Sequence, residues 1–586
     1  MSLLASIGAS KIRSGRFAVV QGTLATACIL VTCLWSLVAA PIANAASARP
    51  VAAEKGMVVT AQHLATKVGV DILKRGGSAI DAAVAVGYAL AVVYPAAGNL
   101  GGGGFMTITF ADGRKTFLDF REKAPRAASR DMFLDKDGNV IKGLSATGWL
   151  AVGVPGTVSG LEYARKKYGT MTRAALTRPA IKLAEDGFAL EQGDADMLAS
   201  AAEDLRRFPA TAKIFLDKGQ SFVAGQRLVQ PDLAETLRLI RKQGVDGFYR
   251  GKTAAAIVKT SRAGGGIIEQ DDLESYKTHE LAPLECDYRG YHVISAPPPS
   301  SGGVAICEML NVLEGYPLRE LGWGSAQALH YEIEAMRHAF VDRNNLLGDP
   351  DFVSNPVREL IDKRYAAKIR DVIKPNKAEI SIDIGQGVVP HEGRNTTHFS
   401  IIDADGNMVA GTQTVNTSFG SCLVIPGTGF VLNNEMDDFA LVPGKPNAYG
   451  LIGYEANAPA KGRRPLSSMT PTFVFGPDKD LVIGTPGGSR IITMVLEGVL
   501  AFVDGMDAQQ IVAKPRFHHQ YLPDVISAEP GALDAKTIAA LRRMNYTVNA
   551  GEHRWGFMNA VIWDRKTNAL DAASDPRGDS GEGKVQ

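Results

Sequence analysis

A change in sequence character at residues 395 and 396 does most to limit what this chain can fold into. Residues 374–395 are polar and interrupted by Gly and Pro, without sustained periodicity, which is typical of an exposed linker. Directly afterwards, the alternation in residues 397–401, a turn at Asp405-Gly406 and a return over residues 409–415 predict a β-hairpin. The chain of 586 residues therefore divides into two long parts at the Asn395–Thr396 bond.

The part before this junction begins with two predicted helices. Leu64, Val68 and Ile72 recur at helical spacing, which predicts an amphipathic helix. Gly76-Gly77 is suited to end that helix in a left-handed conformation, and Ser78 is suited to cap the next one. We expect the two helices to pack against each other.

Hairpins and further helices follow. Alternation in residues 105–110 before an Asp112-Gly113 turn predicts a β-hairpin, and residues 472–485 predict another. Residues 174–340 are predicted to be mostly helical. The last helix of that stretch, capped by Ser325, has an apolar face formed by Leu329, Ile333, Met336 and Phe340. This mixture favours helices layered on antiparallel sheets.

Residues 1–46 have the layout of a secretory signal. They contain three basic and no acidic residues, an apolar run over residues 17–40, and a small-residue end that predicts cleavage after Ala45 or Ala46. Because ~20 apolar residues can span a bilayer, an uncleaved membrane anchor is the alternative. We therefore expect an exported protein, periplasmic or secreted, with anchoring by this segment left open.

The charge balance gives no reason to expect a nucleic-acid partner. Without the three basic residues of the signal, 60 of the 63 basic residues remain against 62 acidic ones, a net charge of −2. Nucleic-acid binding and binding to an anionic membrane both call for a basic patch or a basic excess. Neither class of partner is therefore expected.

Cysteines and histidines do not predict a disulfide framework or a metal site. Two of the five cysteines lie in the signal, and the mature chain keeps only Cys286, Cys307 and Cys422. This odd and sparse set argues against a disulfide framework. His518-His519 has no second cluster of ligands, so packing or hydrogen bonding is the expected role of the pair. We expect no metal and no organic cofactor.

Thr396 is a candidate nucleophile. A hydroxyl is a weak nucleophile unless a base is adjacent, and an N-terminal residue supplies one in its own α-amino group, with a pKa near ~8. Cleavage of the Asn395–Thr396 bond would create such a residue at the start of a strand. Thr396-Thr397 is alternatively a β-branched pair at a strand start, and the local sequence alone favours this simpler interpretation.

Three other features allow both a chemical and a structural role. The backbone N–H groups of Pro486-Gly487-Gly488 could stabilise an oxyanion, or the glycines could form a tight turn. The carboxylates and amides of residues 433–439 could bind an ammonium group or lie in solvent. Arg121 could bind a carboxylate with its forked guanidinium or pair with Glu122.

Taken together, the sequence resembles the γ-glutamyltransferases, also called γ-glutamyltranspeptidases or glutathione hydrolases, of the N-terminal-nucleophile hydrolase superfamily. The resemblance runs over nearly all of the mature chain, in one order. The matching segments are residues 76–83, 101–104, 119–122, 154–158, 299–303, 347–350, 396–398, 432–434, 464–469 and 486–490.

The resemblance implies roles around the bond after Asn395. Thr396 matches the nucleophile, which also attacks the carbonyl of Asn395 and so divides the precursor into two subunits. Thr414 matches the threonine that supports the nucleophile's hydroxyl. Gly487 and Gly488 match the oxyanion hole.

The resemblance also implies a pocket for the zwitterionic end of a γ-glutamyl group. The residues that match the holders of its α-carboxylate are Arg121, Ser467 and Ser468. The residues that match the holders of its α-ammonium are Asn416, Glu435 and Asp438. Residues 443–450, including Tyr449, match a lid loop that covers the pocket in many members.

The expected fold is therefore α+β, an αββα sandwich of the N-terminal-nucleophile type, with a signal peptide at 1–46, a large subunit at 47–395 and a small subunit at 396–586. The expected activity forms a γ-glutamyl ester on Thr396 and passes the group to water, an amino acid or a peptide, with glutathione as donor. The alternatives are a β-lactam or glutaryl acylase of the same superfamily, which has no need of an ammonium site, and an unprocessed exported binding protein.

Overall fold

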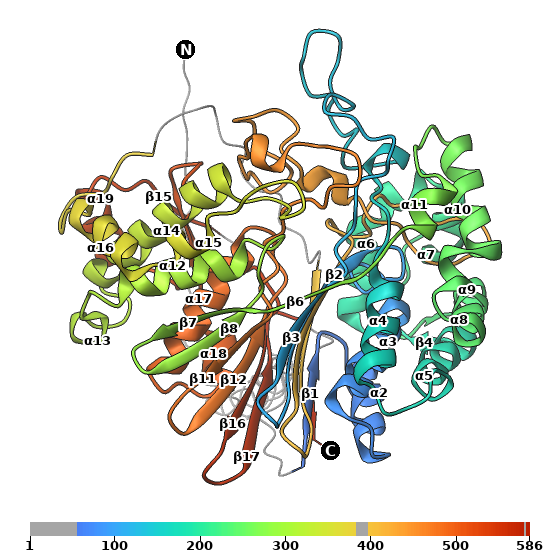
Figure 1. The fold of residues 1–586 in the computed structure, drawn as a ribbon, viewed down its shortest axis with the longest axis horizontal. Coiled ribbons are helices and arrows are strands. Elements are labelled where there is room, and N and C mark those ends of the chain that lie inside the picture. Colours follow the sequence, from blue (N-terminus) through green and yellow to red (C-terminus); the bar gives the residue numbers. More distant parts are fainter. Residues whose placement is uncertain (1–54, 382–395, 552, 579–581, 586) are drawn as a thin grey trace, which may run out of the picture. The chain divides into compact units, whose positions relative to one another are not determined.

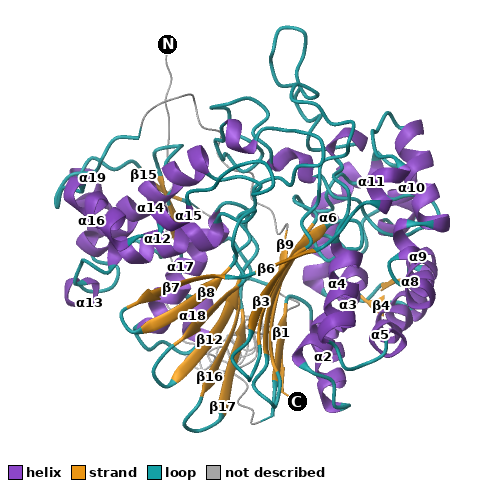
Figure 2. Cartoon of the chain, viewed as in Figure 1, coloured by secondary structure: helices purple, strands orange, loops and turns teal. Residues whose placement is uncertain are grey.

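Two β-sheets face each other, and helices cover the outer face of each (Figures 1 and 2). The computed structural model describes residues 55–381, 396–551, 553–578 and 582–585. The predicted signal at 1–46 and Asn395 lie outside the described residues. The αββα prediction is confirmed by these four layers.

The first sheet combines strands from both sides of the 395–396 junction. All of its neighbouring strands are antiparallel. In spatial order they are β18 (Glu582–Val585), β1 (Met57–Thr60), β9 (Thr396–Ile402), β10 (Met408–Thr414), β2 (Gly103–Thr109), β3 (Lys115–Asp119) and β6 (His279–Leu281). The predicted hairpins β2–β3 and β9–β10 are both present, and β9 begins at Thr396, one residue earlier than predicted.

The second sheet contains two strands that the sequence did not predict, although residues 174–340 are mostly helical as expected. Its strands are, in order, β17 (Ala569–Ser574), β16 (Asn559–Asp564), β12 (Lys479–Gly484), β11 (Thr472–Phe475), β8 (Tyr291–Ser295) and β7 (Leu284–Tyr288). The last two, with β6, lie within the stretch predicted to be mostly helical. Strands of three to five residues are too short to interrupt a periodicity that is judged over 11 to 18 residues.

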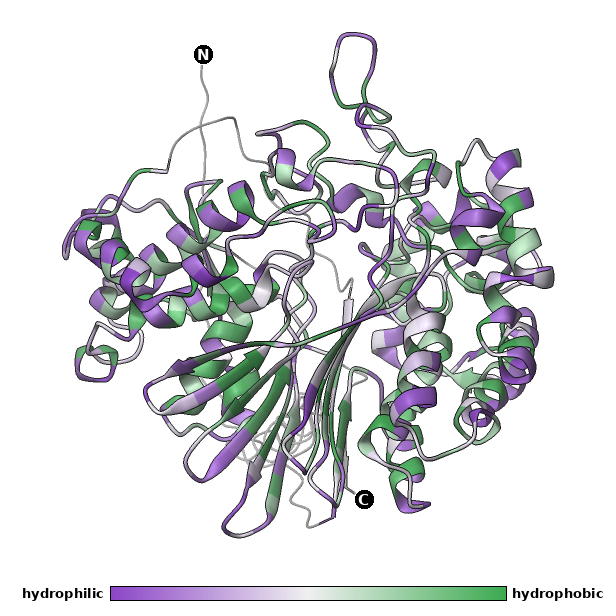
Figure 3. Ribbon diagram, viewed as in Figure 1, coloured by the Kyte–Doolittle hydropathy of each residue, from purple (hydrophilic) through white to green (hydrophobic). Residues whose placement is uncertain are grey.

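Apolar side chains fill the space between the two sheets. Met57, Val59 and Ile402 of the first sheet cluster with Phe473 and Val482 of the second. Side chains on a strand point alternately to opposite faces, so the remaining apolar residues of these strands face the helices. Figure 3 shows the resulting apolar strands in both sheets and the apolar helix α17 (Arg490–Val503).

Helices of the first half of the chain cover the first sheet (Figure 1). They are α2 (His63–Lys74), α3 (Ala79–Val93), α4 (Thr157–Tyr168), α5 (Arg173–Asp186), α6 (Gln192–Arg206), α7 (Pro209–Phe215), α8 (Pro231–Gln243), α9 (Asp246–Tyr249), α10 (Gly251–Ala263) and α11 (Gln270–Glu274). Ser78 caps α3 as predicted, because its hydroxyl accepts from the N–H of Asp81.

A second group of helices covers the other sheet. Besides α17 it contains α12 (Gly302–Leu313), α13 (Leu318–Leu321), α14 (Ala326–Leu346), α15 (Val357–Leu360), α16 (Lys363–Val372), α18 (Ala508–Ala513) and α19 (Ala535–Arg543). Ser325 caps α14 as predicted by accepting from the N–H of Ala328. Smaller sheets are formed by β4 (Phe188–Ala189) with β5 (Arg227–Leu228), and by β13 (Phe517–His518), β14 (Ile526–Ala528) and β15 (Val548–Ala550).

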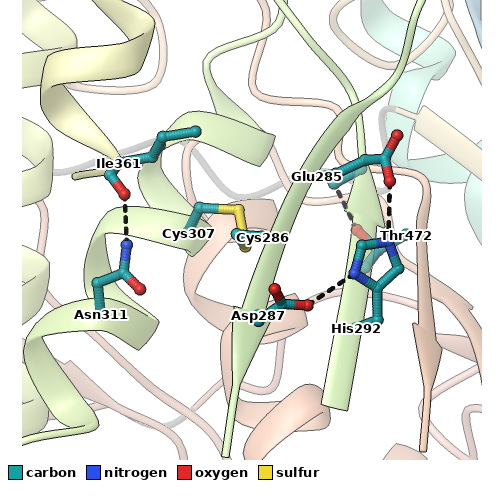
Figure 4. Close-up of a disulfide and its surroundings, with 9 residues drawn as sticks. Glu285, Cys286, Asp287, His292, Cys307, Asn311, Ile361 and Thr472 are labelled. Atoms are coloured by element: carbon teal, nitrogen blue, oxygen red, sulfur yellow. Dashed lines mark hydrogen bonds and ion pairs between the residues drawn. A yellow bond between two sulfur atoms is a disulfide. The ribbon is translucent and has the colours of Figure 1, made fainter. Parts of the chain in front are cut away.

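Cys286 and Cys307 form a disulfide that joins β7 to α12 (Figure 4). The sparse cysteine set argued against a disulfide framework, yet this one bridge is present and Cys422 remains a buried free thiol. The two cysteines are 21 residues apart in sequence, and the fold brings their Cα atoms to 5.9 Å. Pairing of this kind depends on how a strand packs on a helix, which cysteine counting does not reveal.

Replacing Cys286 and Cys307 together by Ser is expected to lower the free energy of unfolding by about 3 kcal/mol. A crosslink across about 20 residues restricts the unfolded chain by this amount. Denaturant unfolding under non-reducing conditions measures the change. Reduced wild-type protein should match the variant, and equal stability of oxidised wild type and variant would contradict the prediction.

Glu497 on α17 is a buried carboxyl that links stability to pH. The N–H of Phe517 donates to its Oε1 at 3.3 Å, and Lys514 Nζ lies 3.8 Å from its Oε2. Burial raises the pKa of Glu497 from 4.5 to about 8, against the opposing charge of Lys514. The folded state therefore holds a proton between pH 4.5 and 8 that the unfolded state has released, and stability falls as pH rises through this window.

Glu497→Gln is expected to flatten this dependence, because the amide keeps the acceptor for Phe517 and cannot ionise. The difference should reach a few kcal/mol, on the order of 1.4 kcal/mol per pKa unit. Denaturant unfolding at a series of pH values from 5 to 9 measures it. Glu203→Gln, at an exposed position, is the matched control; parallel curves for Glu497→Gln and wild type would refute the assignment.

Candidate active site

Most of the predicted site residues line one pocket. Those that line it are Thr396, Thr414, Arg121, Asn416, Glu435, Asp438, Tyr449, Ser467, Ser468 and Gly488. Gly487 does not line the pocket, and Asn395 lies outside the described residues. Residues that the sequence did not single out complete the wall: Leu451, Met469, Ser489 and Ile491.

Thr396 and Thr414 face each other across the β9–β10 pair. They are directly opposite in the antiparallel register, and their Oγ1 atoms are 3.1 Å apart. The N–H of Asn416 donates to Thr414 Oγ1 at 2.9 Å, which fixes the second hydroxyl. In the uncut chain the nitrogen of Thr396 belongs to a peptide bond, so an α-amino base exists there only after cleavage.

Arg121 pairs with Glu122, as one of the two interpretations expected, and also with two carboxylates far along the chain. Its Nη1 donates to Glu435, its Nη2 donates to Asp438 at 2.5 Å, and its Nε donates to the carbonyl of Pro465 at 3.2 Å. Glu122 lies 3.9 Å away. Glu435 and Asp438 belong to the short 3₁₀ helix η2 (Glu435–Asp438), so the two predicted ammonium ligands are ion-paired with Arg121.

Three carboxyls and one guanidinium make this region electrostatically coupled. Burial raises the pKa of Glu122 to about 7 and raises the pKa of Glu435 well above its usual value, while Arg121 opposes both shifts. Burial acts to lower the pKa of Arg121, but Glu435 and Asp438 outweigh it and raise the pKa above its usual value. A cation that entered the pocket would favour the ionised form of these carboxyls.

Tyr449, in the loop predicted to be a lid, lines the pocket. Its hydroxyl donates to the carbonyl of Asn416 at 2.6 Å, and its side chain is buried. Asn416 has φ +75°, and its Nδ2 donates to the carbonyl of Asn434 at 3.0 Å, so the residue is held on both sides. A Cβ at Gly488 would lie 2.3 Å from the Tyr449 ring. This position of the Tyr449 ring therefore requires glycine at residue 488.

Gly487 and Gly488 form the turn that leads from β12 into α17. Both have positive φ, +141° and +57°, which favours glycine. The N–H groups of Arg490 and Ile491 donate to their carbonyls. The structural role that the sequence allowed is therefore present, and a role as oxyanion donors remains compatible with it.

The His518-His519 pair is buried and hydrogen-bonded. His518 contacts Thr493 Oγ1 at 2.8 Å and Gln520 Oε1 at 2.9 Å, and His519 contacts Asp524 at 3.2 Å. Burial lowers the pKa of His518 to about 3. Across the residues that the structure describes, no group of three or more His, Cys, Asp or Glu side chains is arranged to hold a metal ion.

Arg343 is the main polar neighbour of the pocket that the sequence interpretation missed. It follows Phe340 by three residues on α14, so it continues the predicted apolar face, and its Nη2 donates to Ser468 Oγ at 3.2 Å. A charged residue in line with an apolar face was the available signal.

Comparisons with known proteins agree on one family. The model of the family described as Gamma-glutamyltranspeptidase matches residues 65–585. A protein of Pseudomonas sp. (strain A14) named "Glutathione hydrolase proenzyme" is 65% identical over 497 residues, 84% of this chain and 86% of that protein. A protein of the same name from Escherichia coli (strain K12) is 47% identical over 532 residues, 90% of this chain and 91% of that protein. Among solved structures, the cephalosporin acylase from Bacillus halodurans has a TM-score of 0.81 and 28% identity, and the match covers 92% of this chain and 97% of that one.

Proposed function

The chain belongs to the gamma-glutamyltranspeptidase family, and from that premise we propose that it is a self-processing γ-glutamyltransferase and glutathione hydrolase. It acts on γ-glutamyl compounds, with glutathione as the main donor. The observation that carries the proposal is the pocket itself, where Thr396 lies beside a set of groups suited to both charges of an amino acid.

Processing precedes activity. Thr396 Oγ1 attacks the carbonyl carbon of Asn395, the peptide C–N bond breaks as the nitrogen takes a proton, and an ester joins the two residues. Water then cleaves this ester and frees the α-amino group of Thr396. The products are a large subunit that ends at Asn395, beginning at residue 47 if the signal is removed, and a small subunit of residues 396–586, which remain together as a heterodimer.

The new α-amino group of Thr396 then serves as the base for γ-glutamyl transfer. Thr396 Oγ1 attacks the γ-carbonyl of the donor while the amino group takes the hydroxyl proton, and the N–H groups of Gly487 and Gly488 stabilise the oxyanion. The proton passes to the leaving amine, and a γ-glutamyl ester remains on Thr396. Water, an amino acid or a dipeptide cleaves this ester.

The two charges of the donor replace contacts between Arg121 and the carboxylates of the site. Its α-carboxylate lies against Arg121, Ser467 and Ser468. Its α-ammonium lies against the remaining ligands, Asn416, Glu435 and Asp438. Hydrogen bonds with charged partners are the strong ones, so exchanging the internal Arg121 contacts for substrate contacts leaves every charge paired.

A β-lactam or glutaryl acylase is the second candidate, because a cephalosporin acylase shares the fold over most of both chains. A glutaryl group has no ammonium. This pocket contains two carboxylates, Glu435 and Asp438, and the amide of Asn416, which are suited to bind an ammonium. Hydrolysis of a γ-glutamyl anilide and of the matching glutaryl anilide distinguishes them. We expect the γ-glutamyl compound to react; preference for the glutaryl compound would establish the acylase.

Self-processing is tested on a denaturing gel with N-terminal sequencing. We expect two fragments, the smaller beginning at Thr396. A single intact chain that persists would instead support a binding protein. The N-terminus of the larger fragment also tests export with signal cleavage; among the described helices, none is long and apolar enough to cross a membrane.

A further inference from the structure

Arg343 is a buried cation with only neutral neighbours as hydrogen-bond partners. Its side chain is 4% exposed. Its Nε donates to Ser301 Oγ at 2.9 Å, its Nη1 to Asn344 Oδ1 at 3.1 Å and its Nη2 to Ser468 Oγ at 3.2 Å. Within the parts of the chain that the structure describes, no carboxylate forms an ion pair with it.

Other buried arginines of this protein hold carboxylates. Arg464 pairs with Asp119, Arg516 with Asp575, and Arg337 with both Glu334 and Asp524. Arg343 differs from these three arginines in having no carboxylate within ion-pair distance among the described residues.

An uncompensated buried charge is costly. Guanidinium does not lose its proton at neutral pH, and burying an ion without a partner costs several kcal/mol. Burial lowers the pKa of Arg343 to about 10, which still leaves it charged at pH 7. The cost is recovered when an anion comes close, so the position favours an anionic ligand.

The pocket offers an anion a place next to this charge. Arg343 donates to Ser468 Oγ, and the N–H of Met469 donates to Ser467 Oγ at 3.1 Å. Each serine oxygen therefore already accepts a hydrogen bond, and its hydroxyl hydrogen is left to donate into the pocket that both serines line. Two hydroxyl donors in the wall of one pocket match the acceptor oxygens of a carboxylate.

Arg121 does not make this second cation redundant. Glu435 and Asp438 are ion-paired with Arg121, whereas Asp438 acts on Arg343 only through its charge and forms no direct ion pair with it. Ser468 lines the pocket and accepts a hydrogen bond from Arg343. The positive charge of Arg343 polarises the Ser468 hydroxyl, which makes it a stronger hydrogen-bond donor to a carboxylate.

We propose that Arg343 is a positioning residue that, through Ser468, makes the enzyme select donors with an α-carboxylate. The inference rests on the proposed function, since it names a determinant of how that site recognises its donor. It predicts that the charge of Arg343 contributes to binding of the α-carboxylate and has little influence on a donor that lacks it.

The test compares γ-glutamyl p-nitroanilide with 4-aminobutanoyl p-nitroanilide, which differs only in lacking the α-carboxylate. In Arg343→Gln, kcat/KM for the γ-glutamyl compound should fall by about tenfold or more, mainly through KM, as expected for loss of a charge-assisted contact. For the 4-aminobutanoyl compound it should change less than about twofold. Arg343→Lys keeps the charge and should retain most of the selectivity.

The outcomes separate this inference from the proposed function. Two results would show a purely structural role and overturn the inference. In the first, Arg343→Gln lowers kcat/KM equally for both substrates. In the second, Arg343→Lys loses as much selectivity as Arg343→Gln. Wild type that releases p-nitroaniline from neither compound would overturn the proposed function instead.

If Arg343→Gln does not fold or self-cleave, Ser468→Ala takes its place beside Arg343→Lys. The inference then requires Ser468→Ala to lose selectivity for the α-carboxylate while Arg343→Lys keeps it. If Ser468→Ala keeps this selectivity and Arg343→Lys loses it, the inference is overturned.

Discussion

Thr396→Ala should yield one uncut chain that releases no product from a γ-glutamyl donor. The substitution removes the only atom that attacks in both reactions, so no neighbouring group can replace it. Thr414 is 3.1 Å away, but it lies on the partner strand and has no α-amino group to take its proton. We expect the rate of anilide release to fall by at least about 10⁴-fold, as for removal of other nucleophiles.

Two variants serve as controls for Thr396→Ala. Thr396→Ser keeps the hydroxyl and should self-cleave and turn over donor, at reduced rates. Thr397→Val is matched in position and shape: it alters the next residue of β9, whose buried hydroxyl has no hydrogen-bond partner among the described residues. It should process and react like wild type. A fragment that begins at residue 396 in Thr396→Ala, or donor turnover by it, would refute the assigned role.

Elements with strong local signals could be predicted from the sequence. The Ser78 cap, the β2–β3 hairpin and the β9–β10 hairpin each depend on residues close together in the chain. Strands β7 and β8 could not, because five residues carry little periodicity and these strands acquire their conformation by pairing in the second sheet. The same pairing positions Cys286 against α12, which explains why its disulfide was missed as well.

For the site, composition and local motifs suggested residue types, and the resemblance to a family indicated which positions belong together. Neither could show that Arg121 would contact Glu435 and Asp438, which are more than 300 residues away in sequence. That pairing depends on η2 and the end of β3 meeting at one pocket wall. Arg343 was missed because the prediction for its helix used only the apolar residues, although the same face continues into this charged residue.

The second large effect is expected from Arg121→Lys, although this substitution keeps the positive charge. The guanidinium of Arg121 reaches Glu435, Asp438 and the Pro465 carbonyl in three directions at once. A lysine ammonium has a compact charge at the end of a flexible stem and lacks this forked geometry. Because sites built on substrate hydrogen bonds lose on the order of 10⁴-fold when their contacts fail, kcat/KM for γ-glutamyl p-nitroanilide should fall by about 10³- to 10⁴-fold.

The pH dependence of Arg121→Lys distinguishes loss of this network from loss of folding. Arg121 lowers the pKa values of Glu122 and Glu435, which burial raises, so a weaker contact lets both rise further. Carboxyls that carry a proton lack the negative charge that attracts an ammonium and bind it less strongly. The residual kcat/KM should therefore increase from pH 7 to 9 more steeply in the variant than in wild type, while self-cleavage at Thr396 continues. Arg126→Lys, at an exposed pair with Asp271 on the same segment, should leave both rate and pH profile unchanged; a profile for Arg121→Lys parallel to wild type would show that the carboxyls do not depend on Arg121.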